Sequence, residues 1–494
     1  ICIDMSDDRL KQRTAKGLLW GGIGNGALQL LNLVFGIFLA RLLSPSDYGV
    51  IGALTIFSAV AGLLCESGFI LAIVNKKEVT DDDYNAVFWF NVIVAFTLYG
   101  ALFLAAPLIA RFYHTPAMTA LSRVLFLSFL VGGLASAPAA YFFRNLMVKE
   151  RSQIQIVAIV ISGVTGVICA FNGMGYWGLA IQTVLYSGLN SLMMWIRCPW
   201  RPSFSFKMAN LREMLPFSLK QLVTSLFTVI NNNVFSVLLG RFYGMKLTGY
   251  YTQGNKWTTM GYSTLTGMIN SVGQPVMREA SDNIERLRRV FRKMLRFTAF
   301  VSFPAMLGLA IVAPELITIT ITSKWMASVR VMQILCVWGA FMPIGVLYGN
   351  LFNSQGRPDI FMWNTIALGV AQLLTLLASY RFGLNVMLVL FTTVNILWLL
   401  VWQTFAHRQV GLRLRDVLGD IAPYVMLATA VMAGTYFLAA AIANVYVSLV
   451  VKIVVAAAAY IGILWLAGSG MLREAVGYIR HKRIAEEEPT TPEC

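Results

Sequence analysis

The residues best suited to chemistry are polar and charged side chains inside long apolar runs. In four runs they recur every three or four positions, which places each set on one helix face. Such a face must contact protein or water, because lipid offers no hydrogen-bond partner. The four stripes are Asn25, Gln29, Asn32 and Gly36; Thr55, Ser58, Gly62 and Glu66; Lys220, Thr224, Thr228 and Asn231; and Gln253, Lys256, Thr259, Ser263, Thr266 and Asn270. We expect them to line a shared aqueous cavity, with hydrogen bonds between helices as the alternative.

Four cations belong to these runs. Lys220 lies about 9 Å and Lys256 about 12 Å into its run, at about 1.5 Å per residue. An ammonium at such depth is costly unless water or an anion compensates it, so the two lysines predict an electropositive lumen for an anionic substrate. Lys220 can alternatively extend to the headgroups. Arg41 and Arg241 end the first and seventh runs, where they either anchor the helix or contact a phosphate at the cavity mouth.

Glu66 is the one acidic residue that the sequence places well inside a run, just before Ser67-Gly68, where a helix break is natural. One hypothesis is a site for Na⁺ or H⁺ that couples the protein to an ion gradient. The alternatives are a salt bridge to a basic residue such as Lys220, or a structural hydrogen bond. No cofactor or metal site is predicted, since the three histidines are far apart.

The elements that position these residues are membrane helices. Only 13% of the 494 residues are charged, against about 25% in soluble domains, and 57% are hydrophobic. Spans of about 20 residues predict an all-α integral membrane protein with about fourteen transmembrane helices. The predicted spans are 17–40, 48–74, 84–106, 119–142, 153–171, 176–196, 214–240, 248–276, 294–314, 327–350, 360–380, 384–406, 419–442 and 445–468.

The positive charge follows the topology of a membrane protein. The net charge of +16 is no sign of nucleic-acid binding, because Lys and Arg cluster between the apolar runs. With the N-terminus in the cytoplasm, 28 of the 39 Lys and Arg residues fall on the cytoplasmic side and 8 on the outer side. This bias predicts that both termini are cytoplasmic in a multi-pass protein of the bacterial inner membrane.

An internal duplication suggests the domain organisation. Asn32–Val50 aligns without gaps on Asn232–Tyr250, 200 positions later, with six of nineteen positions identical. Duplicated membrane proteins place their site between related halves. We predict an N-lobe of six helices (1–196), a cytoplasmic linker (197–213), a C-lobe of six helices (214–406), an appended helix pair (407–470) and a cytoplasmic tail (471–494).

Three motifs carry a family resemblance. They are LARLLSPSDYG (Leu39–Gly49), ESGF (Glu66–Phe69) and DYNAVFWFN (Asp83–Asn91). The chain resembles the Wzx/colanic-acid-exporter type of the multidrug/oligosaccharidyl-lipid/polysaccharide exporter superfamily. The resemblance implies fourteen helices, two six-helix lobes around a cavity, alternating access, and flipping of an undecaprenyl-pyrophosphate-linked oligosaccharide to the outer leaflet. Glu66 stands where the family more often has Asp, which keeps the charge.

We therefore expect a transporter rather than an enzyme. Its partners would be a lipid-linked oligosaccharide, membrane lipids, and polymerase and ligase proteins of glycan assembly, with no nucleic acid. The alternatives are a lipid II flippase, a drug/cation antiporter of the same superfamily, or a membrane glycan polymerase or ligase. Two lysines against one glutamate disfavour the antiporter, and outer loops of about a dozen residues or fewer disfavour the enzyme.

Overall fold

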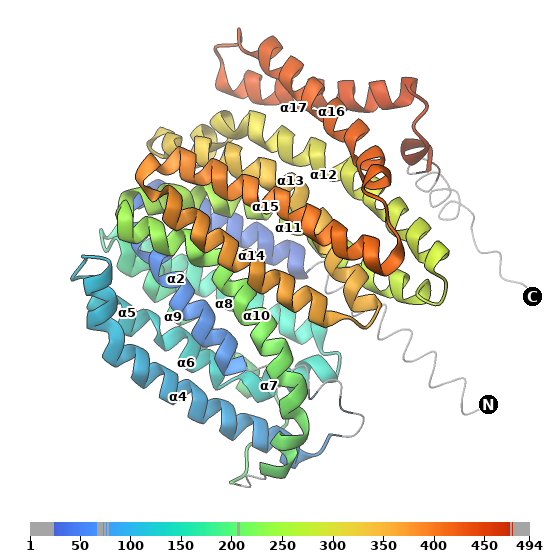
Figure 1. The fold of residues 1–494 in the computed structure, drawn as a ribbon. Helices are drawn as coiled ribbons and strands as arrows, with labels where there is room; N and C mark the ends of the chain where they lie inside the picture. The colour runs from blue at the N-terminus through green and yellow to red at the C-terminus, as the bar shows by residue number, and fades with distance from the viewer. Residues whose placement is uncertain are drawn as a thin grey trace, which may run out of the picture. The chain divides into compact units, whose positions relative to one another are not determined.

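The computed structural model describes residues 24–66, 73, 76, 79–204, 208–474 and 477, with the backbone alone at 66 and 208–221. Within these residues every regular element is a helix, as predicted (Figure 1). Twelve helices are long and apolar enough to cross a membrane, and one bent helix pair adds a thirteenth. The remaining predicted span, 248–276, is the eighth along the chain and coincides with α11 (Met245–Glu279), which carries too many Ser, Thr, Asn and Gln residues to meet that criterion.

The chain forms two compact units, Ile1–Thr252 and Gln253–Cys494. The predicted lobes divide instead at the linker 197–213. α10 belongs to the first unit because it packs on α2 and α4, and it begins before the predicted span does. The division into lobes of spans 1–6 and 7–12 stays a prediction. The helices of the first unit are Gly24–Leu42, α2 (Pro45–Glu66), α4 (Asp81–Phe112), α5 (Met118–Leu125), α6 (Leu127–Gly133), α7 (Ser136–Arg144), α8 (Val148–Phe171), α9 (Tyr176–Arg197) and α10 (Met208–Phe242).

The predicted span 119–142 is broken in the structure. Met118–Gly133 and Ser136–Arg144 meet at an angle of 44°. Pro138 explains the break, because its ring clashes with the carbonyl four residues earlier and it donates no hydrogen bond. Residues on both sides of the break line the cavity described below, among them Gly133 and Ser136.

The two copies of the duplicated stretch touch each other reciprocally. A Cβ added to Gly49 would lie 1.7 Å from the carbonyl oxygen of Met245, and one added to Gly249 would lie 1.7 Å from that of Pro45. Since 45 and 49 correspond to 245 and 249 in the alignment, the two contacts are equivalent. Such reciprocity is the mark of a twofold relation. Only glycine permits this approach of two backbones.

The first family motif holds helix starts together. Asp47 Oδ2 accepts hydrogen bonds from the Ser44 backbone N–H at 2.9 Å and from its hydroxyl. The other oxygen, Oδ1, accepts from the backbone N–H of Tyr176 at 3.0 Å, so one carboxylate caps both α2 and α9. A carboxylate at a helix N-terminus is also favoured by the helix dipole.

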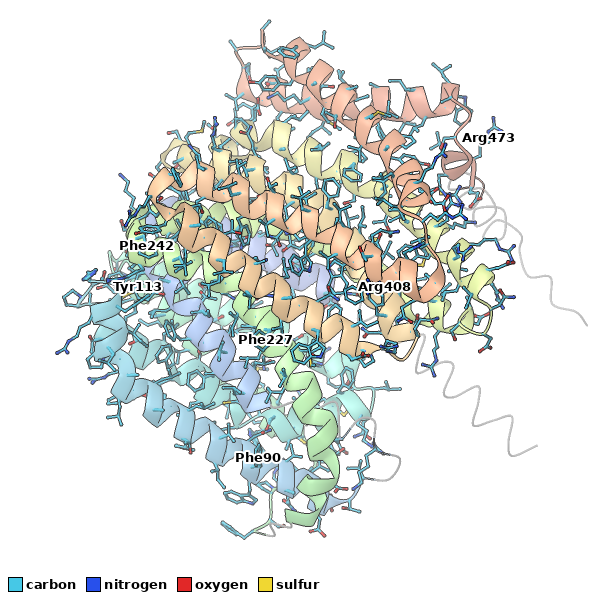
Figure 2. The ribbon with its side chains drawn as sticks, viewed as in Figure 1. Phe90, Tyr113, Phe227, Phe242, Arg408 and Arg473 are labelled. Carbon is cyan, nitrogen blue, oxygen red and sulfur yellow. The ribbon has the colours of Figure 1, made fainter. Side chains whose placement is uncertain are left out.

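The DYNAVFWFN motif fixes the start of α4 in the same manner. Asp83 accepts a hydrogen bond from the Thr80 backbone N–H at 2.9 Å and pairs with Lys76 at 3.0 Å. Asn85 bonds Ser203 through both its amide nitrogen and its oxygen, which ties the chain after α9 to α4. At the other end of α4, Tyr113 (Figure 2) donates its hydroxyl hydrogen to the Ala53 carbonyl at 3.1 Å. Both motifs thus have structural roles.

The second unit contains six long helices after α11. α12 and α13 pack along each other, and α16 and α17 pack on α12 and on one another (Figure 1). These helices are α12 (Ile284–Ile321), α13 (Met326–Ser354), α14 (Pro358–Ser379), α15 (Leu384–Val410), α16 (Leu414–Ala439) and α17 (Val445–Leu466). Many large apolar side chains are exposed, for example Leu104 at 77% and Leu466 at 87%. Apolar surface of this extent suits contact with lipid, and the protein is a multi-pass membrane protein.

Candidate functional site

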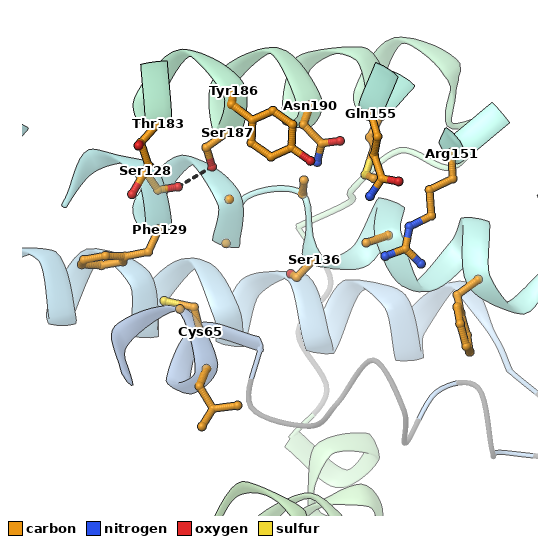
Figure 3. Close-up of a pocket in the computed structure, with 18 of the residues that line it drawn as sticks. Cys65, Ser128, Phe129, Ser136, Arg151, Gln155, Thr183, Tyr186, Ser187 and Asn190 are labelled. Atoms are coloured by element: carbon orange, nitrogen blue, oxygen red, sulfur yellow. Dashed lines mark hydrogen bonds between the residues drawn. The ribbon is translucent and has the colours of Figure 1, made fainter. Parts of the chain in front are cut away.

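The first unit contains a cavity of about 670 Å³ between α2, α6, α7, α8, α9 and α10, and its lining mixes apolar side chains with polar ones. A lumen with so many hydrogen-bonding groups is unusual inside an apolar helix bundle, where polar residues mark functional sites. Figure 3 shows the side chains converging on it from different helices. Its polar lining consists of Ser128, Ser136, Arg151, Gln155, Thr183, Tyr186, Ser187, Asn190 and Ser225.

The cavity has two chemically different ends. Arg151 and Gln155 lie at one end, and Ser128, Thr183 and Ser187 lie at the other (Figure 3). Among the lining residues that the structure describes, Arg151 is the one charged residue. At the hydroxyl end, Ser187 donates to the Ser128 carbonyl and Thr183 donates to the Leu179 carbonyl at 2.8 Å. The hydroxyl oxygens of these residues remain able to accept further hydrogen bonds.

Helical spacing explains how the chain assembles this lining. Thr183, Ser187 and Asn190 follow one another at intervals of four and three along α9, so they share one face. Arg151 and Gln155 are four apart and share a face of α8. α8 and α9 pack extensively on each other, which brings the two faces to one lumen.

Two buried polar atoms of the described lining have no hydrogen-bond partner. Ser136 is 3% exposed, and its Oγ forms no hydrogen bond. The buried Oδ1 of Asn190 also lacks a donor. An unsatisfied buried group costs about 1–3 kcal/mol. Unmet hydrogen-bonding capacity on opposite walls of one cavity is what a site for a polyhydroxylated ligand requires.

The structure places those predicted site residues of the first unit whose side chains it describes outside the cavity lining. None of them lines this cavity, although Gly62 of the second stripe does. Asn25, Gln29, Asn32 and Arg41 are exposed, Thr224 is half-buried and Asn231 is buried.

Arg241 is bound to the end of α4. Its Nη1 donates to the Phe112 carbonyl at 2.8 Å and contacts His114. Its guanidinium also lies 5.3 Å from the centre of the Phe112 ring. These contacts are those of an anchor between helix ends, which was one of the two interpretations of this residue.

The remaining predicted residues lie in the second unit or outside the described side chains. Gln253 is buried with its Nε2 unpaired, Lys256 is half-buried, and the exposed Asn270 accepts a hydrogen bond from Asn350 at 3.3 Å. The side chains of Lys220 and Glu66 are outside the described residues. The predicted shared cavity draws on both units and stays a prediction.

The expectation that Glu66 is the one acid well inside a span is wrong. α12 runs to Ile321, beyond the predicted end at 314, and therefore includes Glu315. Glu315 Oε1 accepts from Lys452 Nζ at 2.5 Å and from the Ser448 hydroxyl at 2.8 Å. The lysine also donates to the Ile311 carbonyl at 3.0 Å. A buried ion pair thus joins α12 to α17.

A second cavity, of about 490 Å³, lies beside this pair between α12, α16 and α17. Its lining is apolar apart from Lys452 and Tyr460, and it includes Phe300, Leu309 and Ile461. Tyr460 donates its hydroxyl hydrogen to the Phe300 carbonyl at 3.0 Å, so that group is satisfied. This cavity offers hardly any free hydrogen-bonding capacity.

Comparison with known proteins identifies the family. Residues 38–330 match the family described as "Polysaccharide biosynthesis protein", which is more than half of the chain. The chain belongs to this family. The predicted resemblance to Wzx-type exporters and the prediction of a transporter rather than an enzyme are both confirmed.

Relatives of this polysaccharide biosynthesis protein come from diverse bacteria. It is 28% identical to the lipopolysaccharide biosynthesis protein WzxC of Escherichia coli K12, over 71% of this chain and 72% of that one. It is 25% identical to the teichuronic acid biosynthesis protein TuaB of Bacillus subtilis, over 72% and 74%. The succinoglycan biosynthesis transport protein ExoT of Rhizobium meliloti is 20% identical over 67% of each chain.

Solved structures share the fold of this family member. The lipid II flippase MurJ in an inward closed conformation superposes with a TM-score of 0.72, covering 93% of this chain and 100% of that one at 15% identity. A multidrug resistance MATE family transporter of the MOP superfamily, in an inward-facing conformation, gives 0.64 over 78% and 94%, also at 15% identity. At 15% sequence identity these superpositions establish a shared fold and nothing about substrate.

Proposed function

We propose that this protein flips an undecaprenyl-pyrophosphate-linked oligosaccharide from the cytoplasmic to the outer leaflet of the inner membrane by alternating access. The polar cavity of the first unit carries the proposal. A lipid-linked glycan has an apolar tail and a polar head, and each unpaired polar group in hydrocarbon costs several kcal/mol. The hydroxyls, the amides and the Arg151 guanidinium in the described part of the cavity lining supply the partners that the head needs during transfer.

The size of the cavity also supports this substrate. About 670 Å³ falls within the roughly 300–1,000 Å³ of sites for drug-sized ligands. It therefore suits one or two sugar units with the adjoining phosphate rather than a long glycan. The rest of the chain of sugars would extend beyond it.

Two other substrates are candidates. The MurJ-like fold over most of the chain favours lipid II, which shares the polyprenyl pyrophosphate. A drug or cation substrate is disfavoured because the one charged residue in the described part of the lining, Arg151, is a cation. Both termini are proposed to be cytoplasmic. Coupling to Na⁺ or H⁺ through Glu66, and association with polymerase and ligase proteins, complete the proposal.

Reconstitution in liposomes tests this function. A fluorescent polyprenyl-pyrophosphate oligosaccharide on one leaflet should become accessible to an impermeant quencher on the other side, at a rate that depends on the protein. Parallel vesicles with labelled lipid II rank the two substrates, and an imposed Na⁺ or H⁺ gradient should change the rate if that ion is coupled. Absence of protein-dependent transfer across several glycan types would refute the flippase.

A pair of matched variants ties the transfer to the cavity. Thr183→Trp fills the hydroxyl end and is expected to abolish transfer. Ile161→Trp adds the same side chain at a residue of α8 that is 43% exposed, and it should leave transfer unchanged. Equal rates for the two variants would mean that the substrate does not pass through this cavity.

A further inference from the structure

We propose that the Arg151 end of the first unit's cavity is a sugar-phosphate subsite, in which Arg151 holds the phosphate and Gln155, Asn190 and Ser136 hold the first sugar. The inference rests on the proposed function for the identity of the substrate. It assigns the recognition of phosphate to a residue outside the four stripes that the sequence singled out.

The position of Arg151 is unfavourable without a ligand. It lies in the first turn of α8, where the helix dipole disfavours a cation. Among the described residues, no carboxylate or carbonyl oxygen binds its guanidinium, although the side chain is only partly exposed. A phosphate would neutralise this charge and can accept two parallel hydrogen bonds from the guanidinium fork.

The adjoining groups suit a sugar. Figure 3 places Gln155 beside Arg151, and places Asn190 and Ser136 between this end and the hydroxyl end. The amides of Gln155 and Asn190 can each donate to and accept from a sugar hydroxyl. Ser136 Oγ and Asn190 Oδ1 are buried and lack a hydrogen-bond partner, so a rotation of either side chain towards the lumen would let a ligand hydroxyl satisfy it.

The order of these groups orients the substrate. With the predicted topology, Arg151 lies on the cytoplasmic side, so the phosphate would lie at the cytoplasmic end of the lumen. The sugar next to it would lie against Asn190 and Ser136, and the following unit would reach Ser187 and Thr183. This orientation keeps the polyprenyl tail, which is attached to the phosphate, at the same end.

Binding to two matched probes tests the subsite. The purified full-length protein in nanodiscs is titrated with a farnesyl-pyrophosphate disaccharide and with the same farnesyl disaccharide lacking phosphate. The native protein should prefer the phosphorylated probe by about tenfold or more, as one charge-assisted hydrogen-bonded pair provides. Arg151→Gln should remove most of this preference without weakening the phosphate-free probe, and Arg151→Lys should keep part of it. Asn190→Ala should weaken both probes by a similar factor.

Arg197→Gln is the matched control. Arg197 is an exposed cation on α9 that donates to Gln153 of α8 at 3.1 Å and does not line the cavity. It should leave both affinities unchanged, and a thermal unfolding curve of each variant confirms that it is folded. An unchanged preference in Arg151→Gln, or an equal loss in Arg197→Gln, would overturn the subsite.

Two further outcomes distinguish the sugar-phosphate subsite from a phospholipid site and from the flippase function itself. If phosphatidylglycerol in the nanodisc displaces the phosphorylated probe as well as unlabelled probe does, the site binds a phospholipid headgroup and the sugar assignment is overturned. If the native protein transfers substrate in liposomes and Arg151→Gln does so at the same rate, the flippase stands and the subsite falls. Loss of transfer by the native protein itself would refute the function instead.

Discussion

The two cavities described above each contain a basic residue, but the two cations differ in their surroundings. Lys452 in the second unit is joined to Glu315 at 2.5 Å and to a backbone carbonyl, beside an apolar cavity. Arg151 in the first unit has no such acidic partner among the described residues, and it lies in a polar cavity. The role of a charged residue inside a membrane protein can therefore be inferred from the groups that surround it. A neutralised charge joins helices, and one without an acid is available to a ligand.

The largest expected effect concerns the neutralised charge. Glu315→Ala leaves the Lys452 ammonium buried without a counter-charge, so the free energy of unfolding should fall by about 3–5 kcal/mol. Chemical unfolding in detergent measures this change. Glu474→Ala is the control, because it breaks a Lys–Glu pair of 2.7 Å whose side chains are 61% and 57% exposed, at a cost of at most about 1 kcal/mol. Similar losses in both variants would contradict a structural role for the buried pair.

A double variant sharpens the same point. Glu315→Leu combined with Lys452→Met removes both charges and preserves the side-chain volume approximately. Buried ion pairs can often be replaced by apolar residues without loss of stability, so the double variant should regain most of the stability that Glu315→Ala loses. Transfer in liposomes should remain at the native rate. A stable double variant that no longer transfers substrate would show that this charge pair also acts in transport.

The smallest expected effect concerns the unpaired hydroxyl of Ser136 in the cavity of the first unit. Ser136→Ala removes an unsatisfied buried hydroxyl, so the protein should become more stable by about 1 kcal/mol while the phosphorylated disaccharide binds severalfold more weakly. Ser191→Ala is matched to it, since this equally buried hydroxyl of α9 donates to the Val131 carbonyl at 2.8 Å outside the cavity lining. That control should lose about 0.5–1.5 kcal/mol and bind normally. A loss of stability in Ser136→Ala would mean that its hydroxyl is satisfied.

The sequence predicts the helices well because a membrane span needs only length and apolar composition. It misses two charged residues, Arg151 and Glu315, because they lie just outside the predicted ends of their spans. Arg151 lies two residues before the predicted span 153–171, and Glu315 lies one residue after the predicted span 294–314. Because α8 begins at Val148 and α12 ends at Ile321, both residues belong to helices. The boundaries of helices in a sequence are uncertain by a few residues, and these charges fall within that margin.

The polar lining of α9 was accessible to sequence reasoning. Thr183, Ser187 and Asn190 follow the same spacing of three and four that defines the four predicted stripes. Which stripes share a lumen, however, depends on the packing of α8 against α9 and on the break before α7. Those are tertiary features that periodicity does not contain. For the same reason, the predicted joint cavity of all four stripes was a statement about packing rather than about sequence.

The reciprocal glycine contact between the two repeat copies has a mechanical consequence. At Gly49 and Gly249 backbone meets backbone, so no side chains interlock there and the surfaces can turn against each other with little steric resistance. Gly52 and Thr252 are equivalent positions of the repeat and lie in contact, close to the local axis. A rotation about that axis moves this pair least, and the displacement grows with distance along α2. The contact would therefore serve as a pivot for such a rotation. Because α2 extends from it to Gly62, the rotation would displace the part of α2 that lines the cavity of the first unit.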